Sequence, residues 1–115
     1  MGFKLYENKG GRSSKPKASI TTAGQIGLNA ASVNKYLKDV EYIHLLYDEE
    51  NKIIGIKKAK KDDSNIFKLT RSGEQGTSSI AGRSFLGFFE IDYSKSRKFI
   101  PEWDSKNEML LIKIE

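Results

Sequence analysis

The sequence predicts an α+β domain that is mainly β. Short runs of β-branched and aromatic residues recur along the chain, bounded by Gly, Asn and Asp turn signals. Two short stretches, one in each half, suit an amphipathic helix. With 115 residues and no Cys, the chain has the length of one domain that folds without disulfides or a structural metal.

The first half has the pattern of two hairpins separated by a helix. Gly24 suits the turn of the first hairpin, and Asn29 is a good helix N-cap. The polar residues 48–52 suit the turn of the second hairpin. The predicted elements are strands at residues 18–22, 25–28, 41–47 and 53–57, and a helix at residues 30–37.

The second half has the same pattern with more divergence. Gly73 takes the place of the first turn glycine, and Ser78 or Ser79 is the expected helix cap. The predicted elements are strands at residues 67–70, 99–103 and 108–114, and a helix near residues 80–88.

These likenesses predict an internal repeat. A shift of 49 positions places Gly24 on Gly73, and a shift of 56 places Asp48 on Asp104, so the second copy has a seven-residue insertion, expected at residues 93–99. Chance similarity between two segments rich in Lys and Ile is the alternative explanation. The predicted organisation is a flexible basic arm at residues 1–16 and one domain at residues 17–115, made of repeat 1 (18–58) and repeat 2 (66–115).

Two stretches around the first predicted helix carry a likeness to a known family. They are residues 18–29 (ASITTAGQIGLN) and residues 41–56 (EYIHLLYDEENKIIGI). Together with the helix they resemble the AbrB/SpoVT-type swapped-hairpin family, and the second copy is a more degenerate version of the same pattern.

The resemblance implies a small barrel in which two β-β-α-β-β copies interlock around a pseudo-twofold axis. Most family members build it from two chains, whereas MraZ-like members carry both halves in one chain, which is the arrangement that this sequence resembles. The resemblance also implies DNA binding and transcription regulation. Family members commonly have Arg after the turn glycine, where this chain has Gln25 and Glu74.

The net charge of +5 is concentrated at one end of the chain. Residues 1–17 carry +4, and the other 98 residues carry +1. Because a local excess of Lys and Arg attracts phosphates, we expect the arm to bind DNA, with single contacts from the domain. Two further basic clusters, at residues 57–61 and 95–98, are typical of a solvated surface. The expected nucleic-acid contacts are Lys9, Arg12, Lys15, Lys17, Arg71 and Arg83.

A protein-interaction module is the alternative function. The nearly balanced charge of the domain favours it, as do Gln25 and Glu74 in place of Arg. Such a module would act as an accessory or inhibitory factor of a mobile element or toxin system.

The sequence contains no constellation of residues that predicts an enzyme. His44 is the single His, and it lies in an alternating strand pattern without a nucleophile or a metal-ligand spacing. The acidic pairs fall in predicted turns, and the Gly-containing turns do not fit a phosphate-loop motif. We therefore expect no catalytic residue, no metal and no cofactor.

Core packing is the expected role of the aromatic residues, and stacking on nucleic-acid bases is the alternative. The residues concerned are Tyr36, Phe85, Phe88 and Phe89 on the predicted helices, and Tyr47 and Trp103 at equivalent strand positions.

The expected compartment is the cytoplasm. No apolar run approaches the roughly 20 residues that span a bilayer, and the first residues lack the apolar segment of a secretory signal. The absence of Cys also favours a reducing compartment. Either a pseudo-symmetric monomer or a homodimer would fit the repeated pattern.

Overall fold

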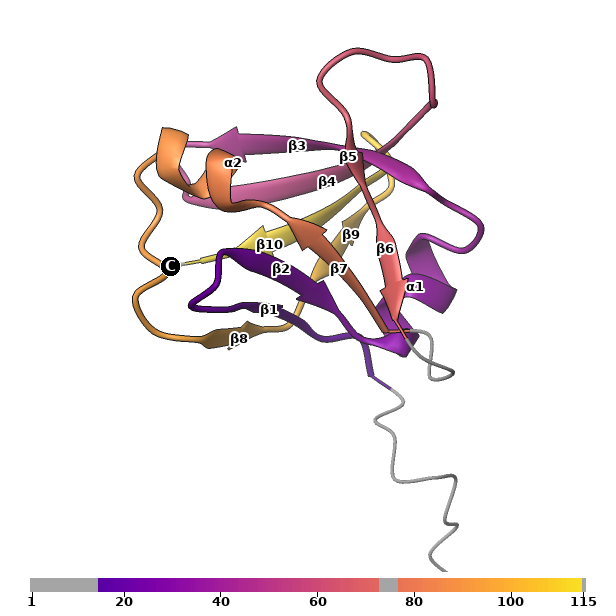
Figure 1. Ribbon diagram of the computed structural model, residues 1–115. Coiled ribbons are helices and arrows are strands. Elements are labelled where there is room, and N and C mark those ends of the chain that lie inside the picture. Colours follow the sequence, from indigo (N-terminus) through magenta and orange to yellow (C-terminus); the bar gives the residue numbers. More distant parts are fainter. Residues whose placement is uncertain (1–14, 73–76, 115) are drawn as a thin grey trace, which may run out of the picture.

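A computed structural model describes residues 15–72 and 77–114 of the chain (Figure 1). Within these ranges it contains ten strands and two short helices. The strands form two antiparallel sheets of five strands each, so the predicted α+β, mainly β class is confirmed. None of the helices in the described ranges is long and apolar enough to cross a membrane.

The first half of the chain contains two hairpins with a helix between them, as the sequence predicts. The predicted first strand is two residues longer than the observed one, because Thr21 and Gly24 already belong to a hydrogen-bonded turn. The elements are β1 (Ala18–Ile20), β2 (Gln25–Leu28), α1 (Ala30–Tyr36), β3 (Tyr42–Asp48) and β4 (Ile53–Ala59).

The second half contains shorter strands around a second helix. Its elements are β5 (Phe67–Lys68), β6 (Thr70–Ser72), β7 (Thr77–Ala81), α2 (Arg83–Phe88), β8 (Arg97–Phe99), β9 (Glu102–Asp104) and β10 (Met109–Lys113). The predicted Gly73 turn lies outside the described residues. In Figure 1, α1 and α2 lie at opposite ends of the molecule.

Each sheet combines strands from both halves of the chain. The first, which we call sheet A, has the order β6-β7-β2-β1-β8, and the second, sheet B, has the order β5-β3-β4-β10-β9. The pairs β2–β7 and β4–β10 therefore join the two halves at the centre of each sheet.

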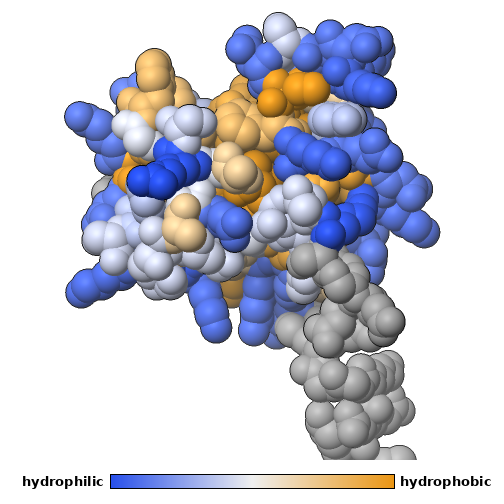
Figure 2. All heavy atoms as spheres, in the orientation of Figure 1, coloured by the Kyte–Doolittle hydropathy of each residue, from blue (hydrophilic) through white to orange (hydrophobic). Residues whose placement is uncertain are grey.

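The core lies between the sheets and is made largely of Ile and Leu. Ile26 lies opposite Ile80 in sheet A, and Ile54 lies opposite Ile112 in sheet B; all four are fully buried. The helices add Val33 and Leu86 among other residues. Hydrophobic side chains are visible in the middle of the molecule in Figure 2, with hydrophilic ones around the outline.

Asn29 begins α1 and also fixes the chain that enters β1. Its Oδ1 accepts from the backbone N–H of Ser32 at 3.0 Å and from that of Lys17 at 2.9 Å. Its Nδ2 donates to the carbonyl of Lys15 at 2.8 Å. One side chain thus caps the helix, as predicted, and holds residues 15–17 against it.

The second helix begins later than predicted. The sequence predicts a Ser cap and the first helical turn within residues 77–81. These residues form strand β7 (Thr77–Ala81) instead, and α2 begins only at Arg83. Pairing with β2 explains the difference, because it places Ile80 opposite Ile26 in the core and alternates buried with less buried residues. Gly82 then takes the cap position without a side-chain hydrogen bond.

Two turns have the same hydrogen bonds at positions 56 residues apart. Asp48 accepts from the backbone N–H of Asn51 at 3.1 Å and from its side-chain amide at 2.8 Å. Asp104 accepts from the same two groups of Asn107 at 3.3 and 2.8 Å. The next residue, Lys52 or Glu108, has a positive φ in each turn, 57° and 53°.

Replacing Asn29 with Ala should lower the free energy of unfolding by about 2 kcal/mol, at the upper end for an N-cap, because the bonds to Lys15 and Lys17 are lost with it. Urea denaturation of the full chain measures the change. Asn34→Ala, at an exposed position of the same helix, is the matched control and should change stability little. An equal loss in both variants would contradict this role of Asn29.

Candidate nucleic-acid interface

The outer face of sheet A has a row of mostly small residues across its strands. Ala18 and Ile20 point into the core, so Ser19 between them points outward. Strand pairing then defines one outward row that crosses all five strands. From β8 to β6 this row is Lys98, Ser19, Gly27, Ser79 and Thr70.

Gly27 leaves the middle of this row without a side chain, so the backbone is accessible there. A Cβ atom at Gly27 would lie 2.7 Å from the Ser19 hydroxyl. Beside it is a shallow depression of about 250 Å³, lined by Lys17, Ser19 and Thr77 among others. Hydroxyl groups and backbone are therefore open to a ligand that lies flat on the sheet.

The charges of sheet A all have one sign. Its five strands contain Arg71, Arg97 and Lys98, and they contain no Asp or Glu. Arg97 pairs with the buried Ile20 and donates to the carbonyls of Asp92 and Ile114, so Lys98 is the cation in the outward row. The strands of sheet B contain four Lys residues together with the carboxylates of Asp48, Glu102 and Asp104. An anion therefore meets no repulsion from the strands of sheet A.

Of the predicted contacts, Lys15 and Lys17 lie next to this face and are exposed. Asn29 holds their backbone, as described above, so Lys15, which the sequence analysis placed in the flexible arm, has a contact with the domain. Lys9 and Arg12 lie outside the described residues.

Lys98 joins Lys17 at the same edge, and it is not among the contacts that the sequence predicts. Lys98 is exposed, and it pairs with Ser19 of β1. Ser19 follows Lys17 by two residues, so Lys17 and Lys98 lie at the same edge. From sequence, Lys98 belongs to a basic cluster with Arg97 in the presumed insertion. Only the pairing of β8 with β1, which joins residues about 80 positions apart, brings that cluster to the start of the domain.

Arg71 has a structural contact at the end of α1. It neighbours the inward-pointing Ser78, and its Nη2 donates to the carbonyls of Val40 at 3.0 Å and Leu37 at 3.4 Å. It also lines a depression that contains the carboxylates of Asp39 and Glu41. These contacts explain Arg71 without a phosphate.

Arg83 lies at the far end of sheet A from Arg71. It begins α2 and is exposed, and its Cβ would be only 2.8 Å from a Cβ at Gly24. Gly24 has a φ of +82°, which is the reason for glycine in this turn. The structure therefore does not bring Arg71 and Arg83 together.

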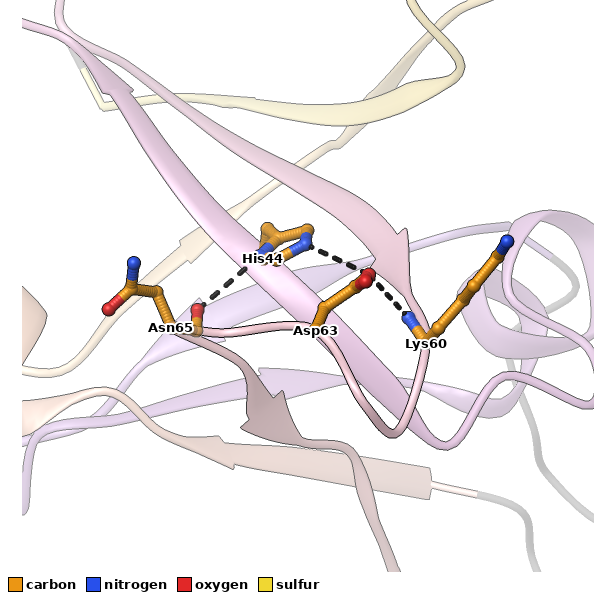
Figure 3. Close-up of polar contacts among 4 residues, drawn as sticks. All are labelled: His44, Lys60, Asp63 and Asn65. Carbon is orange, nitrogen blue, oxygen red and sulfur yellow. Dashed lines mark hydrogen bonds and ion pairs between the residues drawn. The ribbon is translucent and has the colours of Figure 1, made fainter.

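The single His takes part in holding a loop. Its Nδ1 lies 3.3 Å from the carbonyl of Asn65, and its Nε2 lies 3.5 Å from Oδ2 of Asp63 (Figure 3). The backbone N–H of Lys60 donates to the same carboxylate at 2.8 Å. This N–H lowers the pKa of Asp63, and His44 lowers it further.

The aromatic residues form two clusters, one around α1 and β9 and one around α2 and β3. Tyr36 of α1 stacks on Trp103 of β9 with ring centroids 5.2 Å apart, and Phe89 after α2 lies 5.1 Å from Tyr47 of β3. Phe85 is buried in the core. Phe88 differs from the prediction, since it is 80% exposed.

Among the residues that the structure describes, no group of three His, Asp or Glu side chains could hold a metal ion.

Gly24→Ala should lower the free energy of unfolding by about 2 kcal/mol or more, because it adds a strained φ and a clash with Arg83. Gly87→Ala is the matched control. It lies in α2, where a Cβ meets no atom within 4 Å, so it should raise stability by about 0.5 to 1 kcal/mol. Chemical denaturation distinguishes the two, and a stabilised Gly24→Ala would contradict the turn geometry.

Asp63→Ala should destabilise the protein at neutral pH and much less in acid. The pKa of Asp63 in the folded chain lies below its ordinary value of 3.8. The stabilisation of the folded chain by the ionised Asp63 carboxylate is therefore fully present above pH 3.8. It is lost as the pH falls through the lower pKa that Asp63 has in the folded chain. Urea denaturation at several pH values measures this, with the exposed Asp62→Ala as control. The same pH profile in both variants would contradict it.

Comparison with protein-family models, curated proteins and solved structures finds no match to this chain.

Proposed function

We propose that this protein binds DNA without catalysing a reaction, in the manner of a transcription regulator, and that the outer face of sheet A and the basic segment before it form the contact surface. The observation that carries the proposal is the pair of exposed cations Lys17 and Lys98 at one edge of an outer face whose strands contain no carboxylate.

Phosphate contacts suit this surface for two physical reasons. Lys17 and Lys98 are exposed and would release counterions from the DNA, which is the main source of affinity in such contacts. The hydroxyls of Ser19 and Ser79 would donate hydrogen bonds to phosphate oxygens, and Gly27 between them allows close approach. Residues 1–14 add Lys4, Lys9 and Arg12 just before this edge in the sequence.

The arrangement of the hairpins supports the implied interlocked barrel. Each half contributes one hairpin to each sheet, and the central pairs β2–β7 and β4–β10 join the halves. Gly55 pairs with Leu111, 56 positions further along, so a twofold axis between them would exchange the matched turns at Asp48 and Asp104.

The aromatic contacts support the same pseudo-twofold axis. Tyr36 of the first half stacks on Trp103 of the second, while Phe89 of the second half lies against Tyr47 of the first. We therefore propose two repeats, 18–58 and 66–115, as in the MraZ-like arrangement of the swapped-hairpin family. Duplex DNA has twofold symmetry of its own, which a pseudo-symmetric domain can match. The absence of Cys fits the cytoplasm as the compartment.

The test is a fluorescence-anisotropy titration of the full chain with duplex DNA at several salt concentrations. The double variant Lys17→Ala/Lys98→Ala should bind more weakly, and the slope of log K against log salt should fall by roughly 1.8, for two lost phosphate contacts. Lys60→Ala/Lys61→Ala removes the same charge from an exposed loop beside sheet B and should change the slope little.

The proposal fails if the full chain does not bind DNA at low salt, or if the two double variants weaken binding equally.

A failure to bind DNA at low salt would favour the protein-interaction module. Exposed apolar residues give that module a specific basis, since Phe88 is 80% and Ile100 is 79% exposed, and such side chains commonly anchor protein partners.

A further inference from the structure

Sheet A is wider than either groove of a DNA duplex. It has five strands, and neighbouring strands lie about 4.8 Å apart, so its edge strands β8 and β6 are about 19 Å apart. The major groove of B-DNA is about 12 Å wide and admits a helix or a two-stranded ribbon, and the minor groove is about 6 Å wide. The whole face therefore cannot enter a groove of an undistorted duplex, and it meets the phosphates that border the grooves.

The side chains at the centre of this face are too short to reach the bases from the phosphates. Base edges lie at the bottom of a major groove that is about 8.5 Å deep. The structure describes the three central strands in full, and all their outward residues except Gln25 are Gly, Ala, Ser or Thr. These residues are Ser19 of β1, Gln25 and Gly27 of β2, and Thr77, Ser79 and Ala81 of β7. The hydroxyls of Ser19 and Ser79 suit phosphate oxygens and not base edges.

The strands of sheet A also give single-stranded bases no surface for stacking. Within these described strands the one aromatic residue is Phe99 of β8. Phe99 pairs with the buried Ala18 and packs against the core, so it lies on the inner side of the sheet. Stacking on aromatic side chains is a main source of affinity for single strands. A single strand on this face would gain phosphate contacts alone, and each is weaker than in a duplex because the charge density is lower.

We propose that sheet A lies across the backbone of duplex DNA without reading bases, so that the protein binds duplexes of any sequence and prefers them to single strands. This inference rests on the proposed DNA binding. Lys17 and Lys98 at one edge contact phosphates, and such contacts position a protein on the duplex but carry no sequence information. Regulation by this surface then depends on how much of the DNA is covered, and not on one binding site.

The preference for a duplex follows from the salt dependence of the phosphate contacts. Lys17 and Lys98 act together with Lys4, Lys9 and Arg12 of the preceding segment. For five phosphate contacts, the slope of log K against log salt has a magnitude of roughly 4.5 with a duplex and roughly 3.5 with a single strand. With equal binding at about 1 M salt, this difference makes the duplex about tenfold tighter at about 0.1 M salt.

Competition anisotropy with the full chain tests the proposal. A labelled duplex of mixed sequence is displaced by unlabelled competitors of equal length, which are an A·T-rich duplex, a G·C-rich duplex and a single strand. The two duplexes should compete within about fivefold of each other, because one good base-reading contact changes affinity by about fivefold or more. The single strand should compete about tenfold more weakly.

Gln25→Ala searches for base readout, since Gln25 has the longest outward side chain in the three central strands. It should leave the affinity ratio between the two duplexes unchanged. Ser79→Ala is the matched control on the neighbouring strand. It should weaken binding to both duplexes equally, because it removes a contact to phosphate and not to a base. Circular dichroism verifies the fold of each variant.

Three results would overturn this inference while the proposed DNA binding stands. They are a preference of more than about fivefold for one duplex, an altered ratio in Gln25→Ala, and a single strand that competes as well as the duplexes. By contrast, a labelled duplex that does not bind at low salt overturns the proposed function, and this inference with it. Equal weakening by Lys17→Ala/Lys98→Ala and Lys60→Ala/Lys61→Ala has the same consequence.

Discussion

The pairing of β4 with β10 is the contact on which the rest of the fold depends. Ile54 lies opposite Ile112 and Ile56 opposite Leu110, and all four side chains are fully buried. Because β4 belongs to the first half of the chain and β10 to the second, neither half has a complete sheet of its own. The pairing of β2 with β7 imposes the same condition on sheet A. The core therefore closes only when both halves are present.

This closed core leaves two outer faces with different chemistry. Small polar residues and Lys cover the outer face of sheet A, where Gly27 keeps the surface low. The outer face of sheet B has Leu46 and Leu111 at its centre and charges of both signs around them. A long anion suits the first surface and an apolar partner suits the second.

Local features of the chain were predictable from sequence, and features that depend on distant pairing were not. Asn29 caps α1 as expected, because a cap needs only the residues that follow it. Ser78 looked like a cap by the same local rule, but pairing with β2 makes it part of a strand. Arg71 looked like a free cation, whereas its donors are used by carbonyls more than 30 residues away. Lys98 gained a place in the candidate interface only through the pairing of β8 with β1.

The sharing of each sheet between the two halves of the chain also affects how the chain folds. The hairpin of β3 and β4 closes over a few residues, whereas Leu28 meets Ser78, its partner across the centre of sheet A, over 50 positions of chain. Contacts of such long range slow folding, because the entropy of closing the loop is lost before the contact forms. During synthesis β2 and β4 remain unpaired edges until the second half emerges. The interval before that pairing is when the chain is most exposed to aggregation.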